Sequence, residues 1–286
     1  MSNRIKGILL IILSAFGFAM MSAFVKLSGD LPSMQKAFFR NIISFLIAFG
    51  MILYHKESFF GRRENQKLLL MRSTLGTLGV ILNFYAIDYL ILSDANMLNK
   101  LSPFFVILFC AIFLKEKLQL THIAIIAVGF LGSLLIIKPA FNIDTIPYIA
   151  GLLSAIFAGS AYTCVRAIGN REKHYTIVFY FSCFSVVTIF PFMIASYTPM
   201  TILQFTYLIL AGIFATIGQF GVTLAYKYAP AKEISIFDYS NIIFSAIISM
   251  VIFNQSPDAL SILGYVVIFS ASLYMFIYNK KLDKAK

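Results

Sequence analysis

Long apolar segments alternate with short polar connections along the whole chain. A helix needs roughly 20 apolar residues to cross the hydrocarbon core of a bilayer. The pattern predicts membrane spans near 7–27, 35–54, 68–88, 92–114, 119–138, 146–169, 175–196, 203–227, 230–253 and 259–279. Because the connections are short, we expect an all-α membrane protein of ten transmembrane helices without an appended soluble domain.

The spans repeat along the chain. Ser14-Ala15 recurs as Ser154-Ala155, 140 positions later, and Tyr89 recurs as Tyr228, 139 positions later. Each copy holds five spans, and an odd number means that the second copy enters the membrane from the opposite side. Inverted repeats around a midplane site are typical of secondary transporters. The sequence therefore predicts two inverted five-helix repeats, 1–140 and 141–286, around a central cavity.

Composition agrees with this pattern, and the positions of the charges add an orientation. The chain is 60% hydrophobic and 12% charged, whereas about 25% charged residues are usual in soluble domains. Basic residues concentrate on the side of the membrane that carries both termini: 17 of the 23 are Arg4, Lys6, Lys56, Arg62, Arg63, Lys67, Arg72, Lys115, Lys117, Arg171, Lys173, Lys227, Lys232, Lys280, Lys281, Lys284 and Lys286. The opposite side has only Lys26, Lys36, Arg40 and Lys138.

An excess of Lys and Arg marks the cytoplasmic side of a membrane protein. We therefore expect a multi-pass protein of the cell inner (plasma) membrane with both termini in the cytoplasm. The net charge of +11 is then a topology signal, so nucleic acid is not expected as a partner. The three cysteines lie in apolar runs, and no histidine pairs with a carboxylate at a metal-ligand spacing. Neither a metal nor another cofactor is expected.

The stretch from Ala95 to Glu116 carries a more specific pattern. It has a small residue, then Pro103 at mid-span, then an apolar run closed by Glu116. Together with the ten spans and Arg40 in the second one, this stretch resembles the EamA-like ten-helix family of the drug/metabolite transporter superfamily. The resemblance covers nearly the whole chain and implies a bundle with spans 1, 3, 4, 6, 8 and 9 near the substrate. That family commonly has Glu where Gln255 stands in the second half.

Two charged residues, Lys100 and Asp238, lie deepest in the predicted spans. A charge at the bilayer centre costs on the order of 3 kcal/mol or more and needs a partner, water or a function. The residues occupy the fourth and ninth spans, which are repeat mates, about eight residues from opposite membrane faces. At 1.5 Å per residue their depths differ by roughly 6 Å, which a lysine side chain can bridge. We expect them to approach one another. The alternative is that Lys100 extends outward to the interface.

Neutral polar residues gather on the third, fourth, sixth, eighth and ninth spans. Single Ser and Thr more often bond a helix backbone or a neighbouring helix, but an unpaired amide in lipid is costly. Mid-membrane Tyr hydroxyls likewise need partners. The predicted substrate-binding residues are Asn83, Tyr85, Asn96, Asn99, Lys100, Tyr162, Gln219, Tyr226, Asp238, Tyr239 and Asn241. Pro103 removes one helix hydrogen bond and is either a hinge or a static kink.

These features favour a secondary active or facilitative transporter of a small organic metabolite, amino-acid-like or nucleoside-like, working by alternating access. Asp238 is the candidate proton carrier. Export of lipophilic organic cations is the alternative, because aromatic residues can stack on a cation. An intramembrane enzyme is a more distant alternative, and the chain lacks the Gly-Lys pair of an ATP-binding P-loop. The expected partners are the substrate and the lipid bilayer, and the sequence leaves monomer and homodimer open.

Overall fold

The computed structural model describes residues 3–115, 119–137, 145–228 and 235–284, and these residues form helices and connections only. The helices are α1 (Asn3–Leu27), α2 (Ser33–His55), α3 (Gln66–Tyr89), α4 (Leu92–Asn99), α5 (Ser102–Phe113), α6 (Leu120–Ile137), α7 (Ile146–Ile168), α8 (His174–Ala195), α9 (Ile202–Tyr228), α11 (Ser240–Phe253) and α12 (Ala259–Lys284). Three short 3₁₀ segments, η1 (Arg63–Asn65), η3 (Gly169–Arg171) and η4 (Ser235–Tyr239), lie between them.

The predicted membrane spans are present. In the described part of the chain, eight helical segments are long and apolar enough to cross a membrane, and Leu120–Ile136 and Phe237–Phe253 are shorter apolar helices. Large apolar side chains stay exposed along the outer surfaces of these helices, where lipid rather than water is the solvent. The fold class predicted from the sequence, an all-α membrane protein of two duplicated halves, is confirmed.

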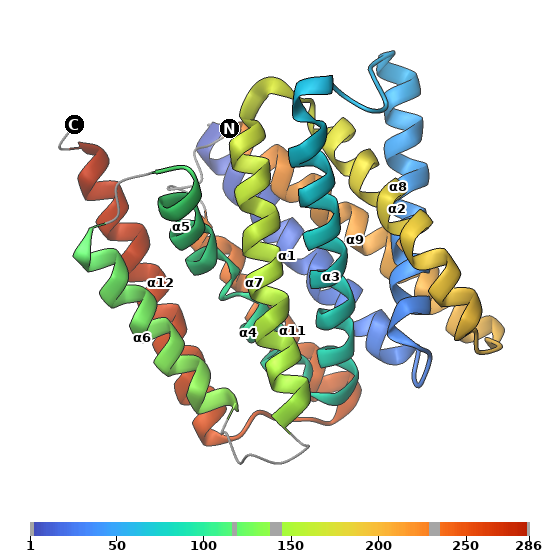
Figure 1. Cartoon of the computed structure of the whole chain (residues 1–286). Helices are drawn as coiled ribbons and strands as arrows, with labels where there is room; N and C mark the ends of the chain where they lie inside the picture. Colours follow the sequence, from blue (N-terminus) through green and yellow to red (C-terminus); the bar gives the residue numbers. More distant parts are fainter. Residues whose placement is uncertain (1–2, 116–118, 138–144, 229–234, 285–286) are drawn as a thin grey trace.

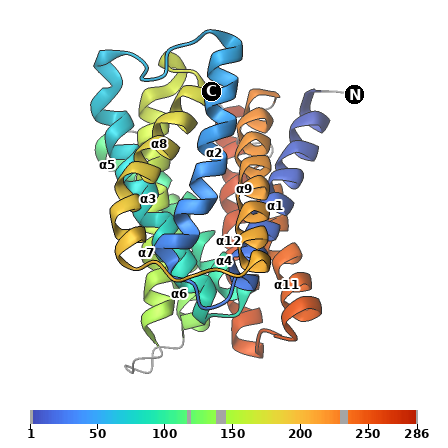
Figure 2. The same ribbon diagram turned by 90° about the vertical axis from the view of Figure 1, so that its right-hand side faces the viewer.

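The two halves pack into each other rather than side by side. Helix α1 packs on α9, and α3 packs on α7; α2 packs on α8, α6 on α12 and α4 on α11. By the repeat, α1, α3 and α6 correspond to α7, α9 and α12. The contact of α1 with α9 is then equivalent to that of α7 with α3, and the other three contacts each join two corresponding helices. Both ends of the chain lie at one end of the bundle, the upper end in Figure 1. We call this the termini face and the other end the opposite face; Figure 2 shows the same bundle after a quarter turn.

Close packing between α1 and α9 depends on two glycines that face one another. A Cβ atom on Gly17 would lie 2.9 Å from the backbone nitrogen of Gly218, and one on Gly218 would lie 2.9 Å from the ring of Phe18. Real Cβ atoms essentially never come this close to a neighbour, so a side chain at position 17 would push the α9 backbone away, and one at position 218 would displace the Phe18 ring. Small residues at helix crossings allow membrane helices to gain van der Waals contact, which replaces the hydrophobic driving force available in water.

Two spans differ from the sequence prediction because their helical geometry is not uniform. The span predicted near 92–114 is interrupted at Lys100 and Leu101, between α4 and α5, and in the described part of the span near 230–253 the 3₁₀ segment η4 passes directly into α11. Pro103 was expected at mid-helix, but it lies in the first turn of α5, where its missing N–H removes no helical hydrogen bond. The break therefore falls just before the proline. Helix α12 also continues five residues beyond the predicted end, to Lys284.

Candidate functional site

The ion pair between Lys100 and Asp238 lies where the two broken spans meet. Lys100 follows the last turn of α4, and Asp238 lies in η4. The Lys100 Nζ atom donates to Asp238 Oδ2 at 2.5 Å, and the two side chains are 13% and 24% exposed. The approach predicted from their repeat-related positions is confirmed. Each charge has its partner, and neither side chain is fully buried.

Tyr239 stabilises the same break from the other half. Its hydroxyl donates to the backbone carbonyl of Lys100 at 3.1 Å and accepts from Ser272 Oγ at 2.5 Å. A broken membrane helix leaves carbonyl groups that need new partners. Lys100 and Tyr239 are repeat mates, so each half contributes to one shared junction.

Three of the predicted binding amides connect helices to one another. Asn96 donates to Ser245 Oγ at 2.8 Å and accepts from Ser22 Oγ on α1. Asn241 donates to the carbonyl of Ala15 at 2.8 Å. Asn99 donates to Ser154 Oγ at 3.0 Å. Hydrogen bonds of this kind stabilise membrane helix packing by roughly 1 kcal/mol each. In this conformation these groups already have protein partners.

The other predicted residues differ in their surroundings. The buried Asn83 Oδ1 has no hydrogen-bond partner among the described residues. The Tyr85 ring packs against Tyr89 with centroids 4.8 Å apart, and Gln219 is half-buried on α9. The side chain of Tyr226 lies outside the described residues.

Two buried arginines form the part of the site that sequence reasoning missed. Arg72 was predicted with the basic residues of a connection but lies inside α3, and Arg40 was predicted in the second span toward the opposite face, where its burial was not foreseen. Each is only 6% exposed, inside α2 and α3. Arg40 Nη1 donates to Asn41 Oδ1 at 2.5 Å, and the Arg72 guanidinium lies 3.8 Å from the centre of the Phe181 ring. A usable signal existed, because Arg72 falls within the predicted third span.

The guanidinium groups of these arginines are not saturated. Arg40 Nε and the Nε and Nη1 atoms of Arg72 have no hydrogen-bond partner, and within the described chain neither residue forms an ion pair. The two groups interact electrostatically with each other and with Tyr162 on α7. Buried guanidinium groups without a carboxylate are unusual, because a buried charge without its counter-ion costs several kcal/mol.

A second polar cluster gathers toward the opposite face, and half of the bonds described here join the two halves. Lys26 Nζ donates to the carbonyl of Leu90 and to Gln255 Oε1, the latter at 2.9 Å. Gln35 exchanges two hydrogen bonds with the backbone of Thr198, at 2.9 and 3.0 Å. Within the first half, Lys36 is fully buried and pairs with Asp88, which also accepts from Ser33.

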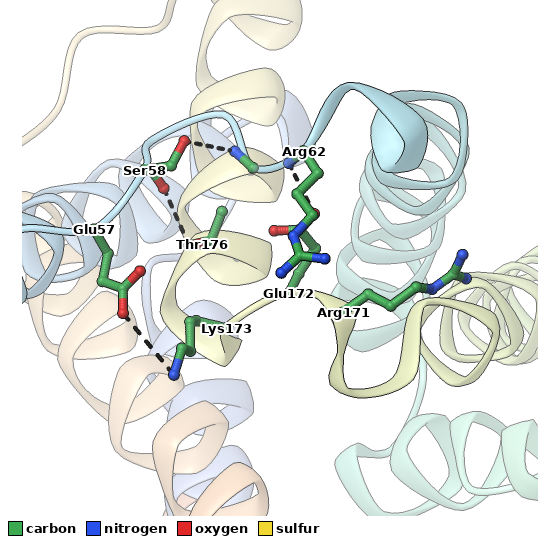
Figure 3. Close-up of a pocket in the computed structure, with 8 residues that line it drawn as sticks. Glu57, Ser58, Arg62, Arg171, Glu172, Lys173 and Thr176 are labelled. Carbon is green, nitrogen blue, oxygen red and sulfur yellow. Dashed lines mark hydrogen bonds and ion pairs between the residues drawn. The ribbon is translucent and has the colours of Figure 1, made fainter.

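A pocket at the termini face contains none of the predicted substrate residues (Figure 3). It lies between the connections α2–α3 and α7–α8. Glu172 Oε1 accepts from the backbone N–H of Arg62 at 2.8 Å and from Asn65 Nδ2 at 2.6 Å. Lys173 and Glu57 form an exposed ion pair of 3.9 Å across the same pocket. These contacts connect two loops of different halves, and we assign the pocket no ligand. Over the described ranges, no group of three or more His, Cys, Asp or Glu could hold a metal ion.

A duplicated bundle of ten membrane spans, broken at matching places in both halves, defines a polytopic membrane transporter of the two-repeat class. The model of the EamA-like transporter family matches residues 5–138 and 145–277. The chain belongs to this family, in the drug/metabolite transporter superfamily, and is a transporter and not an enzyme.

Individual relatives match along most of their length. The pseudopaline exporter CntI of Pseudomonas aeruginosa is 34% identical over 270 residues, 93% of this chain and 94% of the relative. A riboflavin transporter of Brucella anthropi is 26% identical, over 86% of this chain and 88% of the relative. A solved crystal structure superposes with a TM-score of 0.68 at 14% identity, covering 96% of this chain and 98% of the other. At that identity the likeness shows the fold alone.

Proposed function

We propose that the protein moves a small organic metabolite across the cell inner membrane by alternating access. The two repeats, 1–140 and 141–286, rock against each other around a site at the junction of the broken spans. The excess of Lys and Arg at the termini face supports cytoplasmic termini. Discontinuous helices in corresponding positions of two repeats are a structural indication of a transporter's substrate site.

The observation that carries this proposal is the ion pair between Lys100 and Asp238. It joins the two repeats at their matching breaks, so relative motion of the repeats must stretch, break or re-form it. Both side chains are partly accessible. A zwitterionic substrate could replace the pair by bringing its own carboxylate and ammonium groups, which would couple binding to movement of the repeats.

The cluster near the opposite face supports one assignment of the conformation. Lys26–Gln255 and Gln35–Thr198 join the halves on that side, whereas Tyr162, on the half of α7 nearer the termini face, is 43% exposed. We infer that the site is closed toward the opposite face and approached from the termini face.

Substitution of Lys100 tests the site. We expect Lys100→Ala to abolish uptake by proteoliposomes while the protein still inserts and purifies as wild type. Substrates for this assay come from a thermal-shift screen of amino acids, nucleosides and riboflavin against the purified protein. Lys173→Ala, which removes an exposed lysine, is the matched control. Undiminished flux in the Lys100 variant would refute the proposed site.

Asp238 is our candidate for proton coupling. Uptake should increase when a pH gradient is imposed across the proteoliposome membrane, and Asp238→Asn should remove this dependence. If flux in the wild type is indifferent to the gradient, the protein is a facilitative transporter and Asp238 serves only to bind Lys100 or the substrate.

A further inference from the structure

Arg40 and Arg72 together present unused hydrogen-bond donors inside the bundle. Both side chains are more than nine-tenths buried. Arg40 Nε and two nitrogens of Arg72 lack a partner within the described chain. Asn41 and Phe181 contact the two guanidinium groups, but an amide and an aromatic face leave the positive charge in place.

The surroundings of Tyr162 show where a ligand could reach these donors. The Tyr162 side chain interacts electrostatically with both arginines and with Asp238. It nevertheless keeps 43% of its surface accessible. Tyr162 is thus an accessible side chain within electrostatic range of these three charged groups, and we take the space beside it as the approach of the ligand.

The described charged groups that act on Tyr162 are Arg40, Arg72 and Asp238, and Asp238 is the partner of Lys100. Because Lys100 is paired with Asp238, an excess of two positive charges belongs to the arginines. A guanidinium group matches the geometry of carboxylate and phosphate oxygens and binds them through two parallel N–H···O bonds.

We propose that Arg40 and Arg72 bind the anionic group of the transported compound, so that the substrate is an organic anion with a carboxylate or a phosphate. This inference rests on the proposed function, because it assigns a substrate class to that site. Tyr162 contributes its hydroxyl and ring beside the anionic group. A lipophilic cation would meet an excess of positive charge here, so the alternative raised by the aromatic content is disfavoured.

Paired ligands test this proposal without knowledge of the natural substrate. Thermal unfolding of the detergent-purified full chain is measured with succinate and glutarate, and with their diamides succinamide and glutaramide, which carry no carboxylate. A second arm compares adenosine monophosphate with adenosine. We expect members of one or both anionic sets to raise the melting temperature and their neutral counterparts to leave it unchanged. The arm that responds distinguishes carboxylate from phosphate.

Arginine variants connect such binding to the two residues. Arg40→Gln and Arg72→Gln should each weaken binding of the stabilising anion about tenfold or more, the loss expected for one charge-assisted interaction. Arg63→Gln, on the exposed η1 segment, should bind as wild type. Without ligand, the first two variants should melt at the wild-type temperature or above it, because an uncompensated buried charge has been removed.

Three results would overturn the proposal: no anion of either arm stabilises the wild type, the amides stabilise as well as the acids, or the arginine variants melt lower while binding unchanged. The last result would assign both arginines to the scaffold. Flux distinguishes this failure from failure of the proposed function. Metabolite flux without acid selectivity refutes the anion site alone. Arginine-dependent anion binding without flux of the bound anion refutes the transport mechanism alone.

Discussion

Two groups of buried basic side chains lie in this bundle, and they differ in what surrounds them. Toward the opposite face, Lys36 is fully buried and has the carboxylate of Asp88 as its partner. Farther into the bundle, Arg40 and Arg72 are nearly as buried but contact an amide and an aromatic ring. Both groups occur on α2 and α3, so the same pair of helices carries a neutralised and an unneutralised charge.

The difference separates scaffold from site. A buried ion pair is self-contained, and removing one member leaves an uncompensated charge. An unpaired cation in a membrane interior is costly and usually marks function. The bundle tolerates the unpaired charges of Arg40 and Arg72 because many other contacts stabilise the fold. An anion that neutralises these charges would recover part of their desolvation cost, and this favours its binding.

The largest expected effect comes from breaking the neutralised pair. We expect Asp88→Asn to lower the free energy of unfolding by about 3 to 5 kcal/mol, because Lys36 would remain buried without a counter-charge. Unfolding of the purified protein in detergent measures this change. The double variant Lys36→Met, Asp88→Leu is the control and should recover most of the loss, because it removes both charges. Wild-type stability in Asp88→Asn would show that the pair does not hold α2 and α3 together.

A second substitution tests the opposite change, in which the unpaired Arg40 is given a carboxylate partner. Asn41 already accepts from Arg40 at 2.5 Å, so Asn41→Asp supplies a carboxylate with little change of shape. We expect the free energy of unfolding to rise by about 1.5 to 3 kcal/mol, the value of a hydrogen bond to a charged group. Anion binding in the thermal-shift assay should weaken at the same time, because the new carboxylate competes for Arg40.

Asn41→Leu is the matched control for this experiment. It removes the acceptor without adding a charge and should destabilise the protein instead. If Asn41→Asp leaves both stability and anion binding unchanged, Arg40 does not carry the unpaired charge that distinguishes it from Lys36.

The sequence predicts the helix bundle well because apolar spans and the internal repeat recur at regular intervals along the chain. Apolar length defines the spans, and the repeat places Lys100 and Asp238 on mated helices, where the structure brings them together. A hinge or kink was predicted at Pro103, but the interruption falls just before it, and the 3₁₀ geometry of η4 was not predicted, because a hydropathy pattern does not record local backbone geometry. The break after α4 is stabilised by a hydroxyl from Tyr239, which is distant in sequence.

Arg40 and Arg72 were missed for a different reason. A basic residue within a few positions of a span end is ordinarily read as extending toward the interface, and both residues lie one to two turns from a helix end. Only the packing of α2 and α3 against α7 and α8 shows that their side chains point inward. Conversely, Asn96 and Asn241 were singled out for their polarity, and the structure gives them partners on neighbouring helices.

A substitution of smaller expected effect tests how the Phe181 ring stabilises the unpaired charge of Arg72. We expect Phe181→Leu to lower the free energy of unfolding by about 1 to 2 kcal/mol, because Arg72 loses a desolvated cation–π contact. Repeating the substitution in an Arg72→Gln background isolates this contact, since only the loss of packing should remain there. Equal effects in both backgrounds would mean that the ring provides packing alone.

The smallest effect concerns Gln255 near the opposite face. Its Oε1 accepts from Lys26 at 2.9 Å across the two halves, and both side chains are half-buried. Gln255→Glu replaces this neutral acceptor with a carboxylate, which should stabilise the described conformation by about 0.3 to 1 kcal/mol. The gain is modest because solvent screens a partly exposed pair.

Under alternating access, the same substitution should also slow transport. A stronger contact between Lys26 and the introduced carboxylate favours closure of the opposite face, and every cycle must open that face. We therefore expect a higher melting temperature together with a lower maximal flux, and both effects should shrink at high salt. Gln255→Leu removes the acceptor and should change both quantities in the opposite direction. If Gln255→Glu stabilises the protein but leaves flux unchanged, opening of this face does not limit turnover, and the cluster around Lys26 is scaffold like Lys36 and Asp88.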